Sequence, residues 1–347
     1  MKQQKKSKPT AHRYITAIVA VLIAVACYGI WLSGHDPNQK PDISAQSCAV
    51  DPVLLYNPCR PWIGSSSGSY PQASGDLISQ LTFLNKRVND PTVLTYPTKS
   101  ISLTHKIDVA HIYQSPGNNL FSSEALKLIN STDYQYVMVN WKPMPSNSYH
   151  WADVNANNAT EKAYVQAAAN AVAALPAGKK IFLAPFHEPE NDVSVNNCAT
   201  NASGASMGSP TDYVNMWHYI HSVFDQTKDA GGQSASSHVL WVINFMGFSK
   251  WNCLIPQLWP GNNYVDWVAW DPYGSGPSDF DNSVGSLYKY MSQNSGGDHD
   301  YLSKKWALNE FGYGSGASTN FNDAGALQYW KDALKSINAG TWSLIKM

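Results

Sequence analysis

The sequence predicts a (β/α)8 barrel, an α/β fold in which eight parallel strands alternate with helices. Short apolar runs recur along the chain, and polar loops and amphipathic stretches separate them. Most runs are almost continuously hydrophobic, as expected for parallel strands that are covered on both faces. No G-x-G-x-x-G motif follows the first run, which removes the usual reason to expect a doubly wound dinucleotide-binding sheet.

Seven strands are expected before the C-terminal segment. In chain order they are PWIGSS (61–66), IDVAHIY (107–113), YVMVNW (136–141), IFLAPF (181–186), VLWVIN (239–244), VDWVAW (265–270) and WALNE (306–310). The final stretch, TWSLIKM (341–347), has the composition of an eighth strand. We expect strand 8 to be truncated and helix 8 to be missing, so that the edges of strands 1 and 7 stay partly unpaired and the barrel is poorly stable.

Three helices are clear between the runs. Residues 159–174 are rich in alanine, the strongest helix former. Another helix should begin at Ser209, as its N-cap, with Pro210 in its first position. The predicted buried stripe of that helix is Tyr213, Trp217, Ile220 and Phe224. A third helix, DAGALQYWKDALKSI (323–337), should bury Leu327, Trp330, Leu334 and Ile337.

The barrel is expected to span residues 48–347, and three segments precede it. Residues 1–13 are basic and should stay in the cytoplasm, whereas residues 14–32 carry no charge. This run is long enough for a transmembrane helix, and it lacks the small-residue site that ends a cleaved signal peptide, so we favour an uncleaved anchor. Residues 33–47 are polar, contain two prolines and are expected to form a linker. Either an anchor or a signal places the barrel outside the cytoplasm, in an extracellular or membrane-anchored position.

Composition narrows the classes of partner. The net charge is −1 and only 14% of residues are charged, so nothing indicates a nucleic-acid partner. The chain has 13 Trp and 19 Tyr, whose rings suit flat, neutral, hydroxylated ligands such as sugars. The expected partner is therefore a polysaccharide substrate, bound by a monomer. No Cys/His cluster has zinc spacing, and we expect no cofactor and no metal.

Four cysteines lie beyond the apolar segment, an even number that indicates disulfides in an exported chain. Three pairings are possible. We expect Cys48–Cys59, which would close a small loop before the first strand, and Cys198–Cys253, which would join the loops after the fourth and fifth strands.

Two carboxylates follow predicted strands that face each other across the barrel. Glu188 ends the fourth strand, in FLAPFHEPEND (182–192), and Glu310 ends the seventh, in KKWALNEFGYG (304–314). Barrel enzymes carry their catalytic residues where strands run into the loops of the C-terminal face. A pair of carboxylates at this place is what glycoside hydrolysis requires, one as the acid and the other as nucleophile or base.

The motifs HEP after the fourth strand, WDPYG after the sixth and NEFG after the seventh resemble glycoside hydrolase family 26, which includes β-mannanases. The resemblance covers roughly residues 58–347. It implies that Glu188 is the acid/base and Glu310 the nucleophile of a retaining enzyme. It also implies that His187 and Asp271 lie at the sugar site and that Tyr273 hydrogen-bonds the nucleophile.

The sequence departs from the family at the fourth strand, where HEPE stands for the usual HEMN and Ala184 stands where an arginine is usual. Asn140 and Trp141 end the third strand and Trp62 lies in the first, so we expect all three to contact substrate. The predicted function is an endo-β-glycanase that hydrolyses β-1,4-mannan by double displacement. The alternatives are an endoglucanase or xylanase, a glycosyl-transferring variant of the same site, and a non-catalytic carbohydrate-binding barrel at the cell surface.

Overall fold

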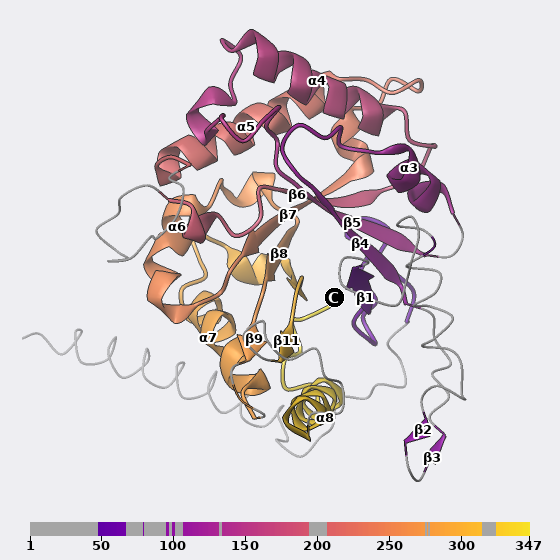
Figure 1. Cartoon of the computed structure of the whole chain (residues 1–347), viewed down its shortest axis with the longest axis vertical. Coiled ribbons are helices and arrows are strands. Elements are labelled where there is room, and N and C mark those ends of the chain that lie inside the picture. The colour runs from indigo at the N-terminus through magenta and orange to yellow at the C-terminus, as the bar shows by residue number, and fades with distance from the viewer. Residues whose placement is uncertain are drawn as a thin grey trace, which may run out of the picture. The chain divides into compact units, whose positions relative to one another are not determined.

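Seven parallel strands, arranged side by side in chain order, form the centre of the structure, a computed structural model that describes residues 48–66, 79, 95–96, 99–100, 107–131, 134–193, 207–274, 276, 278–313 and 324–347 (Figure 1). The strands are β1 (Gly64–Ser66), β4 (Val109–Gln114), β5 (Tyr136–Trp141), β6 (Ile181–Pro185), β7 (Val239–Phe245), β8 (Trp267–Trp270) and β10 (Lys305–Leu308). Each pairs in parallel with the next. This order confirms the predicted strands and the barrel-type α/β fold.

Two short strand pairs complete the sheets. β2 (Thr95–Tyr96) and β3 (Lys99–Ser100) are antiparallel, and β9 (Tyr273–Gly274) pairs in parallel with β11 (Gly312–Tyr313). The second pair continues β8 and β10 beyond their carboxyl ends. It therefore brings Tyr273 beside the segment that follows Glu310.

The last residues of the chain lie where the eighth strand was predicted. Ile345 forms a parallel bridge with Trp306 of β10, and the N–H of Lys346 donates to the carbonyl of Trp306 over 2.7 Å. On the other side, the carbonyl of Lys346 accepts the N–H of Trp62, just before β1, at 2.8 Å. Residues 345–347 thus link the two ends of the seven-stranded sheet. The expected truncation of strand 8 and its expected cost in stability both stay predictions.

Helices lie on the outer side of the strands (Figure 1). They are α3 (Ser123–Asn130), α4 (Ala159–Ala173), α5 (Pro210–Gln226), α6 (Ile255–Leu258), α7 (Phe280–Gln293) and α8 (Ala324–Asn338). Single-turn and longer 3-10 helices connect them: η2 (Trp151–Asp153), η3 (Pro189–Asn191), η4 (Ala235–His238), η5 (Ser249–Leu254), η6 (Asn262–Tyr264) and η7 (Tyr301–Ser303). Ser209 caps α5 as predicted, through a reciprocal bond pair with Asp212, and the predicted stripe of α5 is buried.

The predicted buried stripe of α8 is wrong at Trp330 and Leu334, whereas Ile337 is partly buried against the core as expected. Trp330 and Leu334 are 39% and 58% exposed, whereas Tyr329 and Ala333 are buried. The aromatic ring of Tyr329 packs so closely over Gly274 that an added Cβ there would meet it at 2.6 Å. This contact sets the rotation of α8, and the apolar pattern within the helix did not reveal it.

The buried hydrophobic side chains form two clusters, one inside the barrel and one between the strands and the helices. The inner cluster is Trp62, Val109, Tyr136, Met138, Phe182, Ala184, Leu240, Val242, Trp267, Ala269 and Ala307. The outer cluster lies between strands and helices and contains the alternate strand residues, for example Val139 and Trp141. Successive residues of a strand point to opposite faces, so each strand contributes to both clusters.

One helix of the wall buries a carboxyl group. Glu161, in the first turn of α4, is fully buried, and neither of its carboxyl oxygens has a hydrogen-bond partner among the described residues. Burial and, second, the negative charge of Asp153 raise the pKa of Glu161 from 4.5 to about 8. An acid with such a pKa holds its proton at neutral pH.

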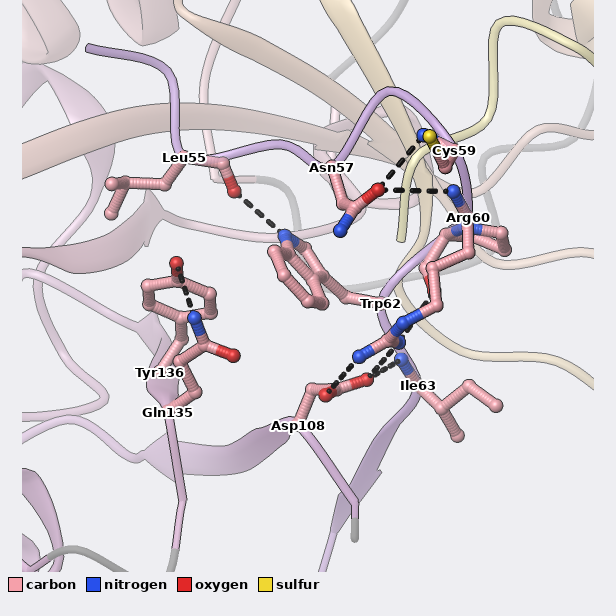
Figure 2. A network of polar contacts seen from close by, with 10 residues as sticks. Leu55, Asn57, Cys59, Arg60, Trp62, Ile63, Asp108, Gln135 and Tyr136 are labelled. Atoms are coloured by element: carbon pink, nitrogen blue, oxygen red, sulfur yellow. Dashed lines mark hydrogen bonds and ion pairs between the residues drawn. The ribbon is translucent and has the colours of Figure 1, made fainter. Parts of the chain in front are cut away.

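The segment 53–56 covers the base of the barrel, where the strands begin. The indole N–H of Trp267, the first residue of β8, donates to the carbonyl of Leu54 over 2.9 Å. The indole N–H of Trp62 donates to the carbonyl of Leu55 over 2.7 Å (Figure 2). Two tryptophans therefore hold the segment by its backbone.

An ion pair fixes the chain between this segment and β1. The guanidinium of Arg60 binds both oxygens of Asp108 at 2.7 and 2.8 Å, and Asp108 also accepts the N–H of Ile63 at 3.0 Å (Figure 2). Such a two-bond pair fixes orientation as well as distance. It sets the place at which β1 enters the sheet.

The disulfide predicted between Cys48 and Cys59 is confirmed. Cys253 is also disulfide-bonded, but its predicted partner Cys198 lies outside the described residues. The predicted membrane-spanning segment, 14–32, lies outside them as well. Within the part of the chain that the structure describes, no helix has the length and apolar character needed to cross a bilayer.

Candidate active site

A strained turn places Glu188 beyond the carboxyl end of β6. Phe186 and Glu188 both have left-handed backbone angles, with φ of 61° and 53°, and His187 lies between them. The N–H of Phe186 donates to the carbonyl of Trp141 over 2.7 Å, and that of Glu188 to the carbonyl of Asn244 over 2.9 Å. A non-glycine residue in this region costs about 1–3 kcal/mol, and such residues concentrate at functional sites. The neighbouring strands hold the turn in place.

Two tyrosine hydroxyls hold the carboxylate of Glu310, which lies just beyond β10. Tyr113, in β4, donates to one oxygen over 2.6 Å, and Tyr273, in β9, donates to the other over 2.9 Å. Burial and the charge of Glu310 raise the pKa of both tyrosines above its ordinary value, so both remain neutral donors. A hydrogen bond to each oxygen therefore fixes the orientation of the Glu310 carboxylate. The bond predicted for Tyr273 is present.

Glu188 and Asp271 form a pair of carboxyl groups next to Glu310. Burial raises the pKa of Glu188, the hydrogen bond with Asp271 opposes this, and the charge of Glu310 raises it again. Asp271 is fully buried, and burial together with Glu310 and Glu188 raises its pKa well above the ordinary range. Burial and the mutual repulsion of the charges thus favour a proton on this pair of carboxyl groups. This arrangement keeps two negative charges out of one buried site.

Amide side chains form a hydrogen-bond network with Asp271, one member of the carboxyl pair. Asn244, in β7, donates to Asp271 over 2.9 Å and accepts a short hydrogen bond from Asn309. Asn309 also reaches Asn140, in β5, at 3.4 Å. The network joins the ends of four strands, β5, β7, β8 and β10, so it fixes the spacing of the site.

Two histidines line the same region. His111 is buried, and its Nδ1 lies 3.3 Å from the hydroxyl of Tyr113. Burial lowers the pKa of His111 to about 4, so the ring is neutral, while burial also lowers the pKa of His187. The ring of His187 meets that of Tyr113 edge-on at 5.8 Å. His111 Nε2 and Asn140 Nδ2 are both buried away from solvent.

The structure brings together most of the predicted site. Glu188, Glu310, His187, Asp271, Tyr273 and Asn140 all lie at the carboxyl ends of the strands. Trp62 and Trp141 do not belong there, which corrects the prediction that they contact substrate. Trp62 is 3% exposed at the base of the barrel, and Trp141 is fully buried against Tyr164 in the outer core.

Tyr113 and Asn309 were not predicted. Tyr113 follows His111 by two residues on β4, so strand alternation places both on one face. Asn309 directly precedes Glu310. No group of three metal-ligating side chains occurs in the described ranges.

Several solved structures with a similar fold are described as GH26 proteins. The catalytic domain of the GH26 endo-β-1,4-mannanase from Bacillus sp. JAMB-750 is 16% identical, with 85% of this chain and 79% of that one covered and a TM-score of 0.50. GH26C from Muricauda sp. MAR_2010_75 is 15% identical, with 85% and 79% covered and a TM-score of 0.53. The modular endo-β-1,4-mannanase from Cellulomonas fimi is 17% identical, with 83% and 63% covered and a TM-score of 0.53.

No protein-family model matches the sequence, and no curated relative matches it either. At these identities the structural likeness establishes the fold alone. That fold is the one which the resemblance to glycoside hydrolase family 26 implied.

Proposed function

We propose that this protein is a retaining endo-β-glycanase that hydrolyses β-1,4-mannan. The observation that carries the proposal is the carboxylate of Glu310, which two tyrosine hydroxyls hold beside the acid Glu188. A carbohydrate-binding barrel does not need a carboxylate fixed on both oxygens or a neighbouring acid with a raised pKa. Retaining glycosidases need both.

In the first step Glu310 attacks the anomeric carbon, and the bond to the leaving oxygen breaks. The electron pair of that bond passes to the leaving oxygen, which takes the proton of Glu188. Burial raises the pKa of Glu188, which favours the protonated form that this step needs. The product is a glycosyl ester of Glu310 with the opposite anomeric configuration.

In the second step Glu188, now ionised, removes a proton from water, which attacks the same carbon. The ester bond breaks, and Glu310 leaves as a carboxylate whose charge Tyr113 and Tyr273 stabilise through their hydroxyls. Two inversions give net retention of configuration. No cofactor enters either step.

Mannan is proposed as the substrate because the similar folds include endo-β-1,4-mannanases and because this chain carries the matching motifs at its strand ends. If β-glucan or xylan were the substrate, its β-glycosidic bond would lie between the same two carboxyl groups. They differ in the sugar hydroxyls that must be recognised. Substrate choice is therefore a question for assay, separate from the reaction type.

The test combines a substrate panel with two catalytic variants. Wild-type protein is assayed for reducing-end release on β-mannan, β-glucan and xylan. Glu310→Ala should abolish release, and azide should restore part of it by forming a glycosyl azide of inverted configuration. Glu188→Ala should still cleave substrates with activated aryl leaving groups, and azide should then give the retained product. Glu124→Gln, on α3, is the matched control.

Each outcome decides a different point. Release from glucan or xylan but not from mannan would keep the mechanism and replace the substrate. Full activity in Glu310→Ala would remove the nucleophile assignment. Binding of mannan without any release by wild-type protein would support the non-catalytic barrel.

We also propose that the barrel works outside the cytoplasm as a monomer, joined to the membrane through residues 14–32. The Cys48–Cys59 disulfide supports this location because disulfides persist in oxidising compartments. Membrane fractionation followed by protease treatment of intact cells tests it. Protection of the barrel from added protease would contradict it.

A further inference from the structure

One buried acid close to the catalytic turn takes no part in the two steps above. Glu190 is 1% exposed and lies two residues after Glu188, in η3. Its carboxyl group accepts the N–H of Met246 at 2.9 and 3.1 Å and that of Gly247 at 3.4 Å. Burying a carboxyl group costs free energy unless its oxygens are paired. Here the first N–H groups beyond β7 pair them.

This contact depends on a residue by which the chain departs from the motif that it resembles. Glu190 is the last residue of HEPE, at the position where the usual HEMN has asparagine. An asparagine side chain is one methylene shorter, so it would not span the same distance from η3 to Met246 and Gly247. The contact is therefore a property of this chain and not of the resemblance.

The catalytic turn is attached to the end of β7 at two points. The N–H of Glu188 donates to the carbonyl of Asn244 over 2.9 Å. Two residues further along both segments, the carboxyl group of Glu190 accepts the N–H of Met246. A single hydrogen bond would let the turn rotate about the contact. Two contacts fix its orientation as well as its position.

Both partners of the second attachment are themselves held. In η3 the N–H of Asn191 donates to the carbonyl of Glu188 over 3.2 Å, so Glu188 and Glu190 belong to one hydrogen-bonded turn. On the other side, Gly247 has φ of 83° and lies so close to Trp270 that an added Cβ would meet that ring at 2.9 Å. The loop therefore cannot follow a displaced turn without breaking its own packing.

Glu188 needs such support because its backbone is strained. Its φ of 53° and ψ of 48° are left-handed. Such angles at a non-glycine residue cost about 1–3 kcal/mol and persist only where the surrounding structure holds them. Without the second attachment, the turn could relax toward ordinary angles and carry the Glu188 carboxyl group with it.

The attachment does not depend on the charge of Glu190. Burial raises the pKa of Glu190 to about 8, although the backbone N–H groups of Glu190 itself, Met246 and Gly247 oppose the rise. With or without its proton, a carboxyl group keeps an oxygen that accepts N–H groups. A neutral side chain of the same length with one acceptor oxygen should therefore serve in its place.

We propose that Glu190 is a positioning residue, which holds the strained turn in the conformation that directs Glu188 at the leaving oxygen. The inference rests on the proposed function and deepens it, because it concerns the acid alone. Glu310 is held separately, through Tyr113 and Tyr273. Loss of Glu190 should therefore weaken acid catalysis and spare the attack by the nucleophile.

The test varies how much the leaving group needs a proton. Dinitrophenyl and phenyl β-glycosides of mannobiose, cellobiose or xylobiose are used, according to the polysaccharide that wild type cleaves. Dinitrophenolate leaves without an acid, whereas phenolate needs one. Glu190→Ala should lower kcat/KM by about 10- to 100-fold on the phenyl glycoside and by less than about twofold on the dinitrophenyl glycoside. Glu190→Gln, with its length and acceptor oxygen, should recover most of the phenyl activity.

Two controls separate positioning from general damage. Glu124→Ala, the same change in the first turn of α3, should follow wild type on both glycosides. Tyr113→Phe acts on the nucleophile and should lower both activities by similar factors. Equal losses on the two glycosides in Glu190→Ala, or no loss on either, would overturn the proposal and leave the proposed function standing. If Glu190→Ala does not fold, Glu190→Asp, which is shorter by one methylene, takes its place.

A spectroscopic measurement decides the role of Glu190 even if wild type cleaves none of these glycosides, in which case the proposed function fails. The ¹³C-labelled carboxyl group of Glu188 is titrated by NMR in wild type and in Glu190→Ala. A displaced turn gives Glu188 more water, so its pKa should fall toward the ordinary value. Glu190→Gln should titrate as wild type does. Identical curves for wild type and Glu190→Ala would refute the positioning role.

Discussion

Glu161 makes the stability of the barrel depend on pH in a direction opposite to that of most carboxylates. The side chain is fully buried in α4, and its carboxyl oxygens have no hydrogen-bond partner in the described part of the chain. Its pKa is about 8 in the folded protein, because of burial and then Asp153, against 4.5 as the ordinary value. Between these two pH values the folded state holds a proton that the unfolded state has lost.

The magnitude follows from linkage. Stability falls with pH wherever the folded state binds more protons, by about 1.4 kcal/mol per pH unit for each such group. For Glu161 the whole contribution is present below pH 4.5, declines through the interval and has been lost above pH 8, a total of about 5 kcal/mol. Glu161→Gln removes the titration while keeping the shape of the side chain.

The assay is the free energy of unfolding from denaturant titrations at several pH values between 5 and 8. The slope against pH of Glu161→Gln should be less negative than that of wild type by about 1.4 kcal/mol per pH unit. Glu124→Gln, the same chemical change in the first turn of α3, should keep the wild-type slope. Slopes for wild type and Glu161→Gln that agree within about 0.3 kcal/mol per pH unit would refute the reasoning, because Glu161 would then lose its proton equally in both states.

Two further predictions concern the site and the base. Tyr113→Phe and Tyr273→Phe each remove one hydrogen bond to Glu310, worth about 1.5–3 kcal/mol for a charged acceptor, so each should lower kcat/KM by about 10- to 150-fold in steady-state assays. An effect from Tyr273 alone would show that Tyr113 does not position the nucleophile. Removing the disulfide with the Cys48→Ser and Cys59→Ser pair should cost about 2–3 kcal/mol, from the entropy of the short loop that it closes, and denaturant unfolding measures it. An unchanged midpoint would mean that the contacts of the base alone hold this segment.

Much of the site could be predicted from the sequence because it lies at strand ends. Glu188 and Glu310 follow apolar runs whose boundaries are clear, and the order of parallel strands brings such ends to one face. The alternation of side chains between the two faces of a strand also predicts which residues point into the barrel. On β5, Met138 belongs to the inner cluster and Trp141 to the outer one, so Asn140 points into the barrel mouth and Trp141 away from it. Applied to β4, the same rule identifies Tyr113.

The remaining features depend on contacts that local pattern does not encode. Trp62 is aromatic and lies in an apolar run, but β1 begins only at Gly64, which leaves the tryptophan at the base. The turn that directs Glu188 needs left-handed angles at two non-glycine residues, and no sequence rule predicts them. The rotation of α8 depends on the close approach of Tyr329 to Gly274, which are far apart along the chain.

The covered base of the barrel keeps the contacts that hold the start of the described chain apart from the carboxyl pair. Segment 53–56 is held where the strands begin, and Glu188 and Glu310 lie where they end. The end of the barrel that carries the two carboxyl groups is therefore not the end that this segment covers.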